Sequence, residues 1–439
     1  MINKIKNKLS LLDEHTLEVV KKSSSSLVVK ILGMLAGFLV SIFIARTLGA
    51  DGLGIINLAN QIITFLLIIS ILGFSQVIIK EVAIADDHSN PNRVRDVLFT
   101  AYIINGVLAV FFTIALIFFA DSLANNFFDT PRLRIPLIIL ALVFTPQIIS
   151  RILSAALVGY KKIWQSNLVD QTLSMVLIGI ILFFLWLFNF EIGVDTIAIV
   201  YAIGRASVTL SVVIYWNYLN RHKTTYKPVF LGRHMLNKGF PLLIVSAALL
   251  ISSSADTIML GWLSNTKEVG LYNVALKLAL LTSFLLQITI STIGPKIAVM
   301  YKNKQIKALE LLLQRVTTVL IGIGLVSLLI FILLGRYVLS IWGAEFIAAY
   351  PILVILAVGQ FFNIASGPVG NILVMTNHEK IIRNITLFTV VLNLVMNFFL
   401  IKNFQAAGAA VATAFTMVLN MTLCYSYVRK KTGLKMFKF

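Results

Sequence analysis

Residues 27–47 read LVVKILGMLAGFLVSIFIART, and after a short break residues 55–79 read IINLANQIITFLLIISILGFSQVII. Each stretch is mostly apolar and is about as long as the roughly 20 residues that a helix needs to cross a bilayer. Lipid offers the backbone no hydrogen-bond partners, so a spanning segment is either a helix or a strand of a closed barrel. These runs are too long and too uniformly apolar for barrel strands. They therefore predict two membrane-spanning helices.

The same pattern continues along the chain. The 439 residues are 59% hydrophobic and 13% charged, whereas an ordinary soluble domain is roughly 45–50% apolar and ~25% charged. Apolar runs of spanning length recur with short polar breaks between them. We expect twelve spans, near residues 27–47, 55–79, 97–119, 135–158, 168–189, 193–216, 239–262, 269–293, 311–334, 347–370, 382–401 and 405–428. The sequence therefore predicts an all-α integral membrane protein of about twelve transmembrane helices.

The basic residues predict how these spans are oriented. A formal net charge of +19 would suggest nucleic acid as a partner of a soluble protein, but Lys and Arg also concentrate in the cytoplasmic loops of membrane proteins. With both termini in the cytoplasm, 27 of the 37 Lys and Arg residues fall in cytoplasmic segments and six fall outside. We therefore expect a multi-pass protein of the inner (cytoplasmic) membrane with cytoplasmic N- and C-termini and no nucleic-acid partner.

An internal repeat relates the two halves of the chain. GIINLA at residues 54–59 matches GLYNVA at residues 270–275, an offset of 216 positions. Six spans separate the copies, so both copies cross in the same direction. This predicts two six-helix bundles related by a pseudo-two-fold axis along the membrane normal, with a substrate site between them. The expected parts are a cytoplasmic N-terminal segment, an N-terminal bundle, a basic cytoplasmic linker, a C-terminal bundle and a cytoplasmic tail, at residues 1–26, 27–216, 217–238, 239–428 and 429–439.

Charged side chains inside the spans are the first candidates for function. On insertion scales, placing a charge at the centre of a bilayer costs about 2.5–3.5 kcal/mol, so such a residue usually faces a cavity or a partner. Four lie well inside expected spans, namely Arg151, Arg205, Asp256 and Lys277. Two more lie close enough to an interface for the side chain to reach water, namely Asp170 and Arg315.

Uncharged polar residues at helical spacing form stripes on several spans, which favours a hydrated interior. Together with Arg46 at the outer end of the first span, five of them complete the set of expected cavity residues: Asn57, Gln61, Asn273, Gln360 and Asn363. The alternative is that these side chains only hold the bundle together, since interhelical hydrogen bonds contribute about 0.6–2 kcal/mol each.

Patterns typical of catalysis or metal binding are missing from the sequence. The five histidines fall in expected cytoplasmic segments, and the single cysteine, Cys424, lies in the last apolar run, which excludes an intramolecular disulfide. No glycine-rich phosphate loop with its lysine is present. We therefore expect no enzyme, no metal site and no cofactor. Asp256 is instead a candidate for coupling transport to a proton or sodium gradient.

Short motifs resemble those of a known family. They are ARTLG and GIIN at residues 45–49 and 54–57, DTIMLG and VGLY at 256–261 and 269–272, and GP and GAA at 367–368 and 408–410. These stretches resemble bacterial oligosaccharide flippases of the O-antigen (Wzx) type. Those flippases form the polysaccharide biosynthesis family of the multidrug/oligosaccharidyl-lipid/polysaccharide (MOP) exporter superfamily. The likeness covers nearly the whole chain.

The resemblance implies a transporter of lipid-linked oligosaccharide. Such a flippase moves undecaprenyl-pyrophosphate-linked repeat units, of O-antigen and lipopolysaccharide or of another surface polysaccharide, from the inner to the outer leaflet. It works by alternating access through a cationic cavity. The implied partners are the lipid-linked oligosaccharide, membrane lipids, and a polysaccharide polymerase and other pathway proteins. Fixed positive charge suits such cargo because pyrophosphate is anionic.

Two alternatives stay open at this point. One is a cation-coupled exporter of another solute in the same superfamily, which we expect to carry more carboxylates inside its spans. The other is a membrane glycan polymerase or ligase, an enzyme that usually needs a large outer loop. The longest outer connection expected here, around residues 120–134, is short.

Overall fold

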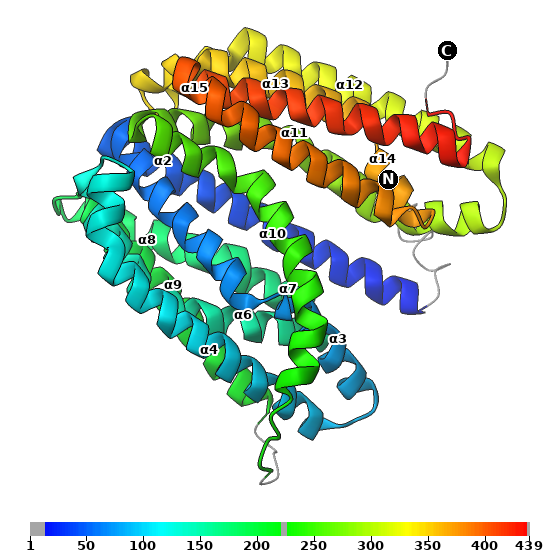
Figure 1. Ribbon diagram of the computed structural model, residues 1–439, viewed down its shortest axis with the longest axis horizontal. Coiled ribbons are helices and arrows are strands. Elements are labelled where there is room, and N and C mark those ends of the chain that lie inside the picture. Colours follow the sequence, from blue (N-terminus) through cyan, green and yellow to red (C-terminus); the bar gives the residue numbers. More distant parts are fainter. Residues whose placement is uncertain (1–13, 221–225, 437–439) are drawn as a thin grey trace. The chain divides into compact units, whose positions relative to one another are not determined.

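The computed structural model describes residues 14–220 and 226–436. Within these ranges the chain forms helices and no strand, which confirms the predicted all-α fold (Figure 1). The expected N-terminal segment, linker and C-terminal tail each lie partly outside the described residues, at 1–13, 221–225 and 437–439.

The α-helices of the first half are α2 (Glu14–Ile71), α3 (Phe74–Asp87), α4 (Pro91–Ser122), α5 (Arg134–Leu142), α6 (Phe144–Gly159), α7 (Ile163–Asn167), α8 (Leu173–Leu187) and α9 (Val194–Leu219). Those of the second half are α10 (Gly232–Leu263), α11 (Thr266–Lys302), α12 (Ile306–Ser340), α13 (Tyr350–Ala365), α14 (Val369–Met375) and α15 (Glu379–Thr432). Short 3₁₀- or π-helical turns are η1 (Leu123–Phe127), η2 (Pro131–Leu133), η3 (Leu168–Thr172) and η4 (Ala344–Ala349).

The described helices account for the predicted spans. Seven helical segments are long and apolar enough to cross a membrane, and two bent pairs, α5 with α6 and α7 with α8, raise the number to nine. Helices α2 and α15 have 58 and 54 residues. At about 1.5 Å per residue each is more than twice as long as a hydrocarbon core of about 30 Å, so each provides two crossings. Counting α2 and α15 as two crossings each raises the nine to eleven, and α10, at the span expected near 239–262, is the twelfth. The total agrees with the twelve predicted spans.

A single non-helical residue divides each of the two longest helices. Gly49 in α2 has φ 72° and Gln405 in α15 has φ 51°. The Glu345 carboxylate accepts a hydrogen bond from Ala50 N at 2.6 Å, directly after the first break. Glu268 does the same for the residue after the second break, at 3.2 Å. Each glutamate therefore caps a new helix N-terminus, where backbone N–H groups lack intrahelical partners.

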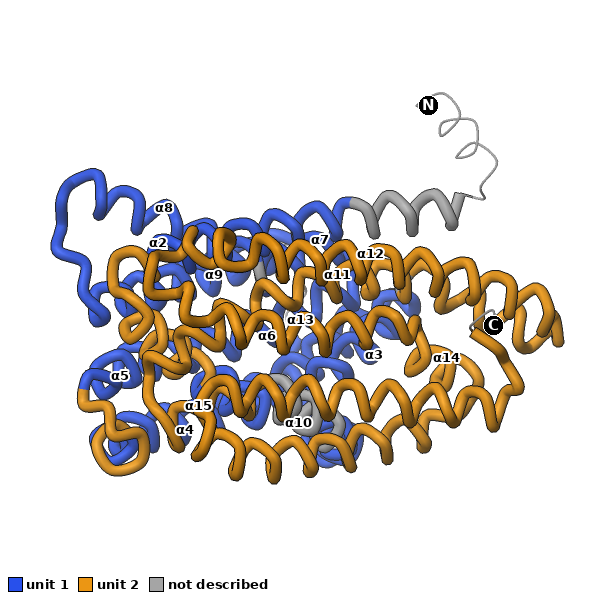
Figure 2. The backbone as a smooth tube through the Cα atoms, turned by 90° about the horizontal axis from the view of Figure 1, so that it is seen from above, with its two compact units in different colours: residues 1–44, 62–123, 132–247 blue, residues 45–61, 124–131, 248–439 orange. Residues whose placement is uncertain are grey.

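Two compact units make up the chain (Figure 2). Unit 1 consists of Met1–Ile44, Ile62–Leu123 and Arg132–Ala247, and unit 2 of Ala45–Gln61, Ala124–Pro131 and Ala248–Phe439. The central part of α2 thus belongs to unit 2. The division of the sequence into bundles at 217–238 stays a prediction.

The two copies of the repeat pack against each other within unit 2. A Cβ atom on Gly54 would overlap the carbonyl of Thr266, and a Cβ on Gly270 would overlap the carbonyl of Ala50. Positions 50 and 54 correspond to 266 and 270 at the same 216-residue offset, so the two contacts are equivalent. Only glycine allows backbones to approach this closely. The contact agrees with a two-fold relation between the copies.

Candidate functional site

A polar cavity of about 400 Å³ lies inside unit 1. Its walls come from α6, α8, α9, the turn η3 and the junction of α2 with α3. Three charged side chains line it, namely Arg151, Asp170 and Arg205. Uncharged polar side chains complete the polar part of the lining, namely Thr64, Ser75, Gln76, Gln147, Ser150 and Ser174. This is a site that can surround a charged, hydrogen-bonding ligand.

The charges of this cavity are unequal in number. Arg151 Nη1 lies 3.4 Å from Asp170 Oδ1, and the two side chains are 43% and 24% exposed. The guanidinium of Arg205 lies 5.7 Å from the centre of the Tyr201 ring, a cation–π distance. With two guanidinium groups and one carboxylate, the lining has a surplus of positive charge. Guanidinium groups present planar pairs of donors that match phosphate oxygens, so the cavity suits an anion.

The turn that carries Asp170 is held firmly in place. It is π-helical, a form often found at functional sites because it displaces side chains from α-helical register. The Thr172 hydroxyl donates to Val29 O at 2.8 Å, which ties the turn to α2. Gly33 of α2 has no room for a Cβ beside Thr172. This close approach packs the turn that carries Asp170 against α2.

The other expected cavity residues lie in unit 2. Arg46 Nε donates to Ile341 O at 2.8 Å. Asn273 Nδ2 donates to Val269 O at 2.8 Å, within its own helix. Partly buried positions on α2 or α11 hold the remaining ones: Asn57, Gln61 and Lys277. Their role in binding stays a prediction, whereas Arg151 and Arg205 share one cavity.

Asp256 is 5% exposed and lies in unit 2 where α10, α11 and α15 meet. We call the parts of α15 before and after the break at Gln405 its first and second arms, and both arms contact Asp256. Its carboxylate accepts hydrogen bonds from Tyr272 OH, from Thr413 Oγ1 at 2.6 Å and from Asn397 Nδ2 at 2.6 Å. In the described part of the chain, every hydrogen-bond donor seen on Asp256 is neutral. The carboxylate is therefore held by dipoles rather than by a salt bridge.

Gln360 and Asn363 lie one helical turn apart on α13. Gln360 is 2% exposed and accepts a hydrogen bond from Ser283, so it is fully enclosed. Asn363 Nδ2 lies 3.2 Å from Gln360 Oε1 and also lines a second cavity, of about 270 Å³, inside unit 2. The two expected site residues therefore differ: Gln360 is buried in the packing between helices, whereas Asn363 borders a cavity.

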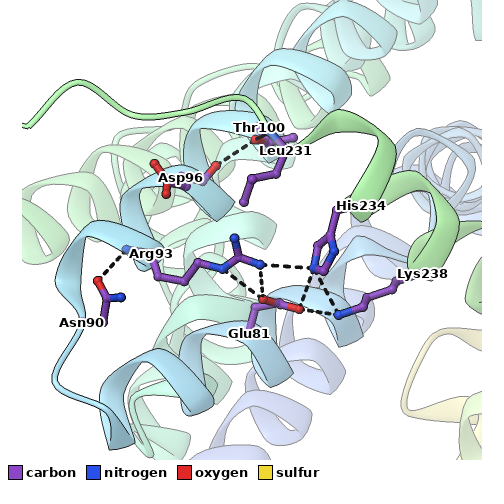
Figure 3. Close-up of polar contacts among 8 residues, drawn as sticks. All are labelled: Glu81, Asn90, Arg93, Asp96, Thr100, Leu231, His234 and Lys238. Atoms are coloured by element: carbon purple, nitrogen blue, oxygen red, sulfur yellow. Dashed lines mark hydrogen bonds and ion pairs between the residues drawn. The ribbon is translucent and has the colours of Figure 1, made fainter.

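A further polar cluster, not anticipated from the sequence, lies where α3, the start of α4 and the start of α10 meet (Figure 3). The Glu81 side chain is 8% exposed and has three basic neighbours. Lys238 Nζ lies 2.7 Å, Arg93 Nη2 2.9 Å and His234 Nε2 3.0 Å from its oxygens. Burial raises the pKa of Glu81, but hydrogen bonds from Lys238, His234 and Arg93 outweigh it and lower the pKa to about 2. Glu81 is therefore ionised at physiological pH.

The segment that leads into α10 is fixed by a second set of contacts. Asp96 Oδ1 accepts from Val229 N at 2.7 Å, and Tyr226 OH donates to Asp96 Oδ2 at 3.2 Å. Leu231 N donates to Thr100 Oγ1 at 2.8 Å (Figure 3). Together with the Glu81 cluster, these contacts attach the described end of the predicted linker to α3 and α4 of unit 1.

Several of these residues escaped the sequence analysis for different reasons. Gln147 precedes Ser150 by three positions and Arg151 by four, so helical spacing on the fourth span was a usable signal for them. The Glu81 cluster gave no such signal, because Glu81 is at least twelve residues from each of its basic partners and polar residues near span ends are common.

The fold and the cavities define a class: a multi-span membrane protein with the architecture of MOP-superfamily transporters. An inward-facing multidrug resistance MATE family transporter of that superfamily superimposes with a TM-score of 0.75 at 15% identity, over 91% of this chain and 94% of the other. Lipid II flippase MurJ in an inward closed conformation gives 0.74 at 16% identity, over 93% and 87%. At these identities the likeness concerns the fold.

Sequence comparison gives the family. The profile described as polysaccharide biosynthesis protein matches residues 19–301, more than half of the chain, and the MatE profile matches residues 241–399. The chain belongs to the polysaccharide biosynthesis protein family. A relative described as a probable low-salt glycan biosynthesis flippase, Agl15 of Haloferax volcanii, is 26% identical over 245 residues. The match covers 55% of this chain and 51% of that protein, so it spans about half of the relative's length.

Proposed function

We propose that this protein is a flippase for lipid-linked oligosaccharide. Its cargo is an undecaprenyl-pyrophosphate-linked repeat unit, of O-antigen or of another surface polysaccharide. It carries this cargo from the inner to the outer leaflet of the inner membrane by alternating access, with both termini in the cytoplasm. The surplus of positive charge in the unit 1 cavity is the observation that carries the proposal.

Electrostatics explains why this cavity matters for such cargo. A pyrophosphate group linked to sugars is too polar to cross hydrocarbon unaided, because a buried charge without partners is strongly unfavourable. Arg151 and Arg205 offer two guanidinium groups inside a membrane protein, and Asp170 neutralises only one of them. The positive charge that remains attracts an entering pyrophosphate. Lys277 in unit 2 is a further proposed cationic contact.

The relatives point to the same kind of cargo. Agl15 is described as a probable flippase of glycan biosynthesis, and MurJ as a flippase of lipid II. Family membership and these descriptions support transport rather than catalysis. A polymerase and other proteins of the same pathway are proposed partners, because a flipped repeat unit has to be consumed on the outer side.

Asp256 is proposed to couple transport to a proton or sodium gradient. It is a carboxylate in the interior of unit 2, and its donors in the described chain are neutral. A bound cation or a proton would therefore find a carboxylate that no basic side chain already balances in that part of the structure. Carboxylate oxygens are ligands that hard cations prefer.

Charge reversal in the unit 1 cavity tests the proposal. Arg151→Glu and Arg205→Glu should each abolish flipping of a fluorescent undecaprenyl-pyrophosphate-linked sugar in proteoliposomes, because they replace attraction to phosphate with repulsion. Arg151→Lys should keep part of the activity, since it retains charge but loses the paired donors. Arg336→Ala is the matched control, because Arg336 packs over the Tyr350 ring in unit 2, 5.0 Å from its centre. Wild-type flipping by both reversed variants would contradict the cationic-cavity proposal.

A further inference from the structure

The second cavity, inside unit 2, differs in chemistry from the first. Six of its eight lining residues carry an amide or a hydroxyl, two are methionines, and none is charged. They are Asn363, Thr389, Asn393, Thr413, Thr416, Met417, Asn420 and Met421. From this lining we infer a binding subsite for an uncharged sugar residue of the cargo, an inference that rests on the proposed flippase function.

The polar lining faces the interior of unit 2 rather than lipid. On the second arm of α15, Thr413, Thr416 and Asn420 are spaced at i, i+3 and i+7, which places them on one stripe. Thr416 is 6% exposed, whereas its neighbour Phe415 is 52% exposed. On the first arm, Thr389 is 5% and Phe388 is 56% exposed. The phenylalanines therefore face outward and the polar stripes face each other.

The contacts across the cavity leave it open. Next to the cavity, Ser283 donates a hydrogen bond to Gln360, and the two residues are 7% and 2% exposed. In the cavity, Asn393 Nδ2 lies 3.4 Å from both the Thr413 and the Thr416 hydroxyl, whereas shorter bonds tie lining groups to residues behind the wall: Thr413 Oγ1 donates to Asp256 at 2.6 Å, and Asn397 Nδ2 donates to Asn393 Oδ1 at 3.0 Å. These bonds hold the lining side chains at the wall, and protein atoms do not fill the space between them. These amide and hydroxyl groups instead surround about 270 Å³.

The groups present match a neutral sugar. A sugar hydroxyl both donates and accepts hydrogen bonds, and so do amide and hydroxyl side chains taken together. Asn420 Nδ2 donates to Thr389 Oγ1 at 2.9 Å, which holds both side chains at the cavity wall. Met417 and Met421 supply flexible apolar surface for the C–H faces of a sugar ring. A phosphate or a uronic acid would lack a counter-charge in this lining.

The repeat offset relates residues of the two cavities and supports different ligands for them, an anion in unit 1 and a neutral sugar in unit 2. Adding 216 to Gln147 gives Asn363, and adding 216 to Arg205 gives Met421. All four residues line a cavity, the first member of each pair in unit 1 and the second in unit 2. An amide is thus retained at one position, and a guanidinium is replaced by a thioether at the other. The two cavities thus share two equivalent positions and differ in charge.

The test compares three lipid probes in proteoliposomes that contain the full-length protein. The probes are a fluorescent polyprenyl pyrophosphate without sugar, the same lipid with one neutral hexose, and the same lipid with one hexuronic acid. Thr416→Val and Asn420→Leu remove hydrogen-bonding groups from the cavity at nearly constant volume. Thr422→Val is the matched control, because Thr422 lies on the same helix arm and is exposed.

We expect both cavity variants to lower the initial flipping rate of the hexose lipid about three- to tenfold, the effect of one or two lost hydrogen bonds, and to leave the sugar-free lipid unchanged. Thr422→Val should leave both rates unchanged. The parent protein should flip the hexose lipid faster than the hexuronate lipid.

Several outcomes would overturn the subsite. They are equal losses on the sugar-free and hexose lipids by well-folded variants, unchanged rates on all probes, a parent that prefers the hexuronate, and variants that lose only their response to sodium. A parent protein that flips none of the probes would contradict the flippase function itself. Thermal unfolding of each purified variant separates loss of binding from loss of folding.

Discussion

Replacing Glu81 with glutamine should loosen the attachment of the predicted linker to unit 1. Glutamine keeps the shape of the side chain but removes the negative charge from among Lys238, Arg93 and His234. Those three groups, two at the start of α10 and Arg93 at the start of α4, would then face one another without this counter-ion. The expected result is a less stable unit 1, and residues 226–231 should become more accessible to protease.

The size of the effect follows from the pKa of Glu81. The folded protein lowers it from 4.5 to about 2, and a shift of one unit corresponds to about 1.4 kcal/mol, which sets an upper bound of roughly 3 kcal/mol. The basic partners are 32–42% exposed, so solvent screens part of the interaction. We therefore expect a loss of about 1–2 kcal/mol at pH 7.

The pH dependence gives a sharper readout than stability alone. Because the pKa of Glu81 is lower in the folded state, its contribution is fully present above pH 4.5 and is lost as the pH falls from 4.5 towards 2. The parent protein should lose linker protection across this window, and Glu81→Gln should lose that part of the pH dependence. Limited proteolysis and thermal unfolding of the purified protein, measured from pH 7 to pH 3, report both effects.

Two controls make the experiment decisive. Asp87→Asn removes an exposed carboxylate from the same helix and should change neither stability nor linker protection. Lys238→Met combined with Glu81→Gln should restore part of the lost stability, because it removes one of the stranded cations. A Glu81→Gln protein with the stability and the acid sensitivity of the parent would refute the reasoning.

Three further predictions concern packing, coupling and topology. Gly54→Ala and Gly270→Ala should each lower the free energy of unfolding by about 1–3 kcal/mol and reduce the yield of folded protein. Gly37→Ala is the control, because a Cβ at this position meets open space. Melting temperatures of the Gly54 and Gly270 variants equal to that of the parent would contradict the close backbone contact. Asp256→Asn should abolish the response of glycan flipping to a proton or sodium gradient in proteoliposomes, and a folded variant that responds fully would leave Asp256 a structural role only. Reporter fusions test the orientation: we expect cytoplasmic signals after Lys162, Lys238 and Lys431 and external signals near Asp129, Asp195 and Lys267, and reversal at any two would exclude the proposed topology.

The sequence by itself determined the membrane-spanning architecture. Span length and apolar character are local properties of consecutive residues, so the number of spans could be read before any contact was known. The repeat at residues 54–59 and 270–275 is also visible in one dimension, and the structure adds that its two glycines lie against each other's backbone. Arg151 and Arg205 stood out because a charge inside a span is energetically costly wherever the helix lies.

Only the tertiary structure decided which side chains meet. The Glu81 cluster joins positions 81, 93, 234 and 238, and the unit 2 cavity joins α13 to both arms of α15. The π-helical turn at 168–172 brings Asp170 to Arg151, and distant glutamates cap the breaks at Gly49 and Gln405. None of these contacts follows from periodicity, because it shows which face of a helix is polar but not which other helix that face will meet. That choice depends on side-chain packing between segments that are tens to hundreds of residues apart.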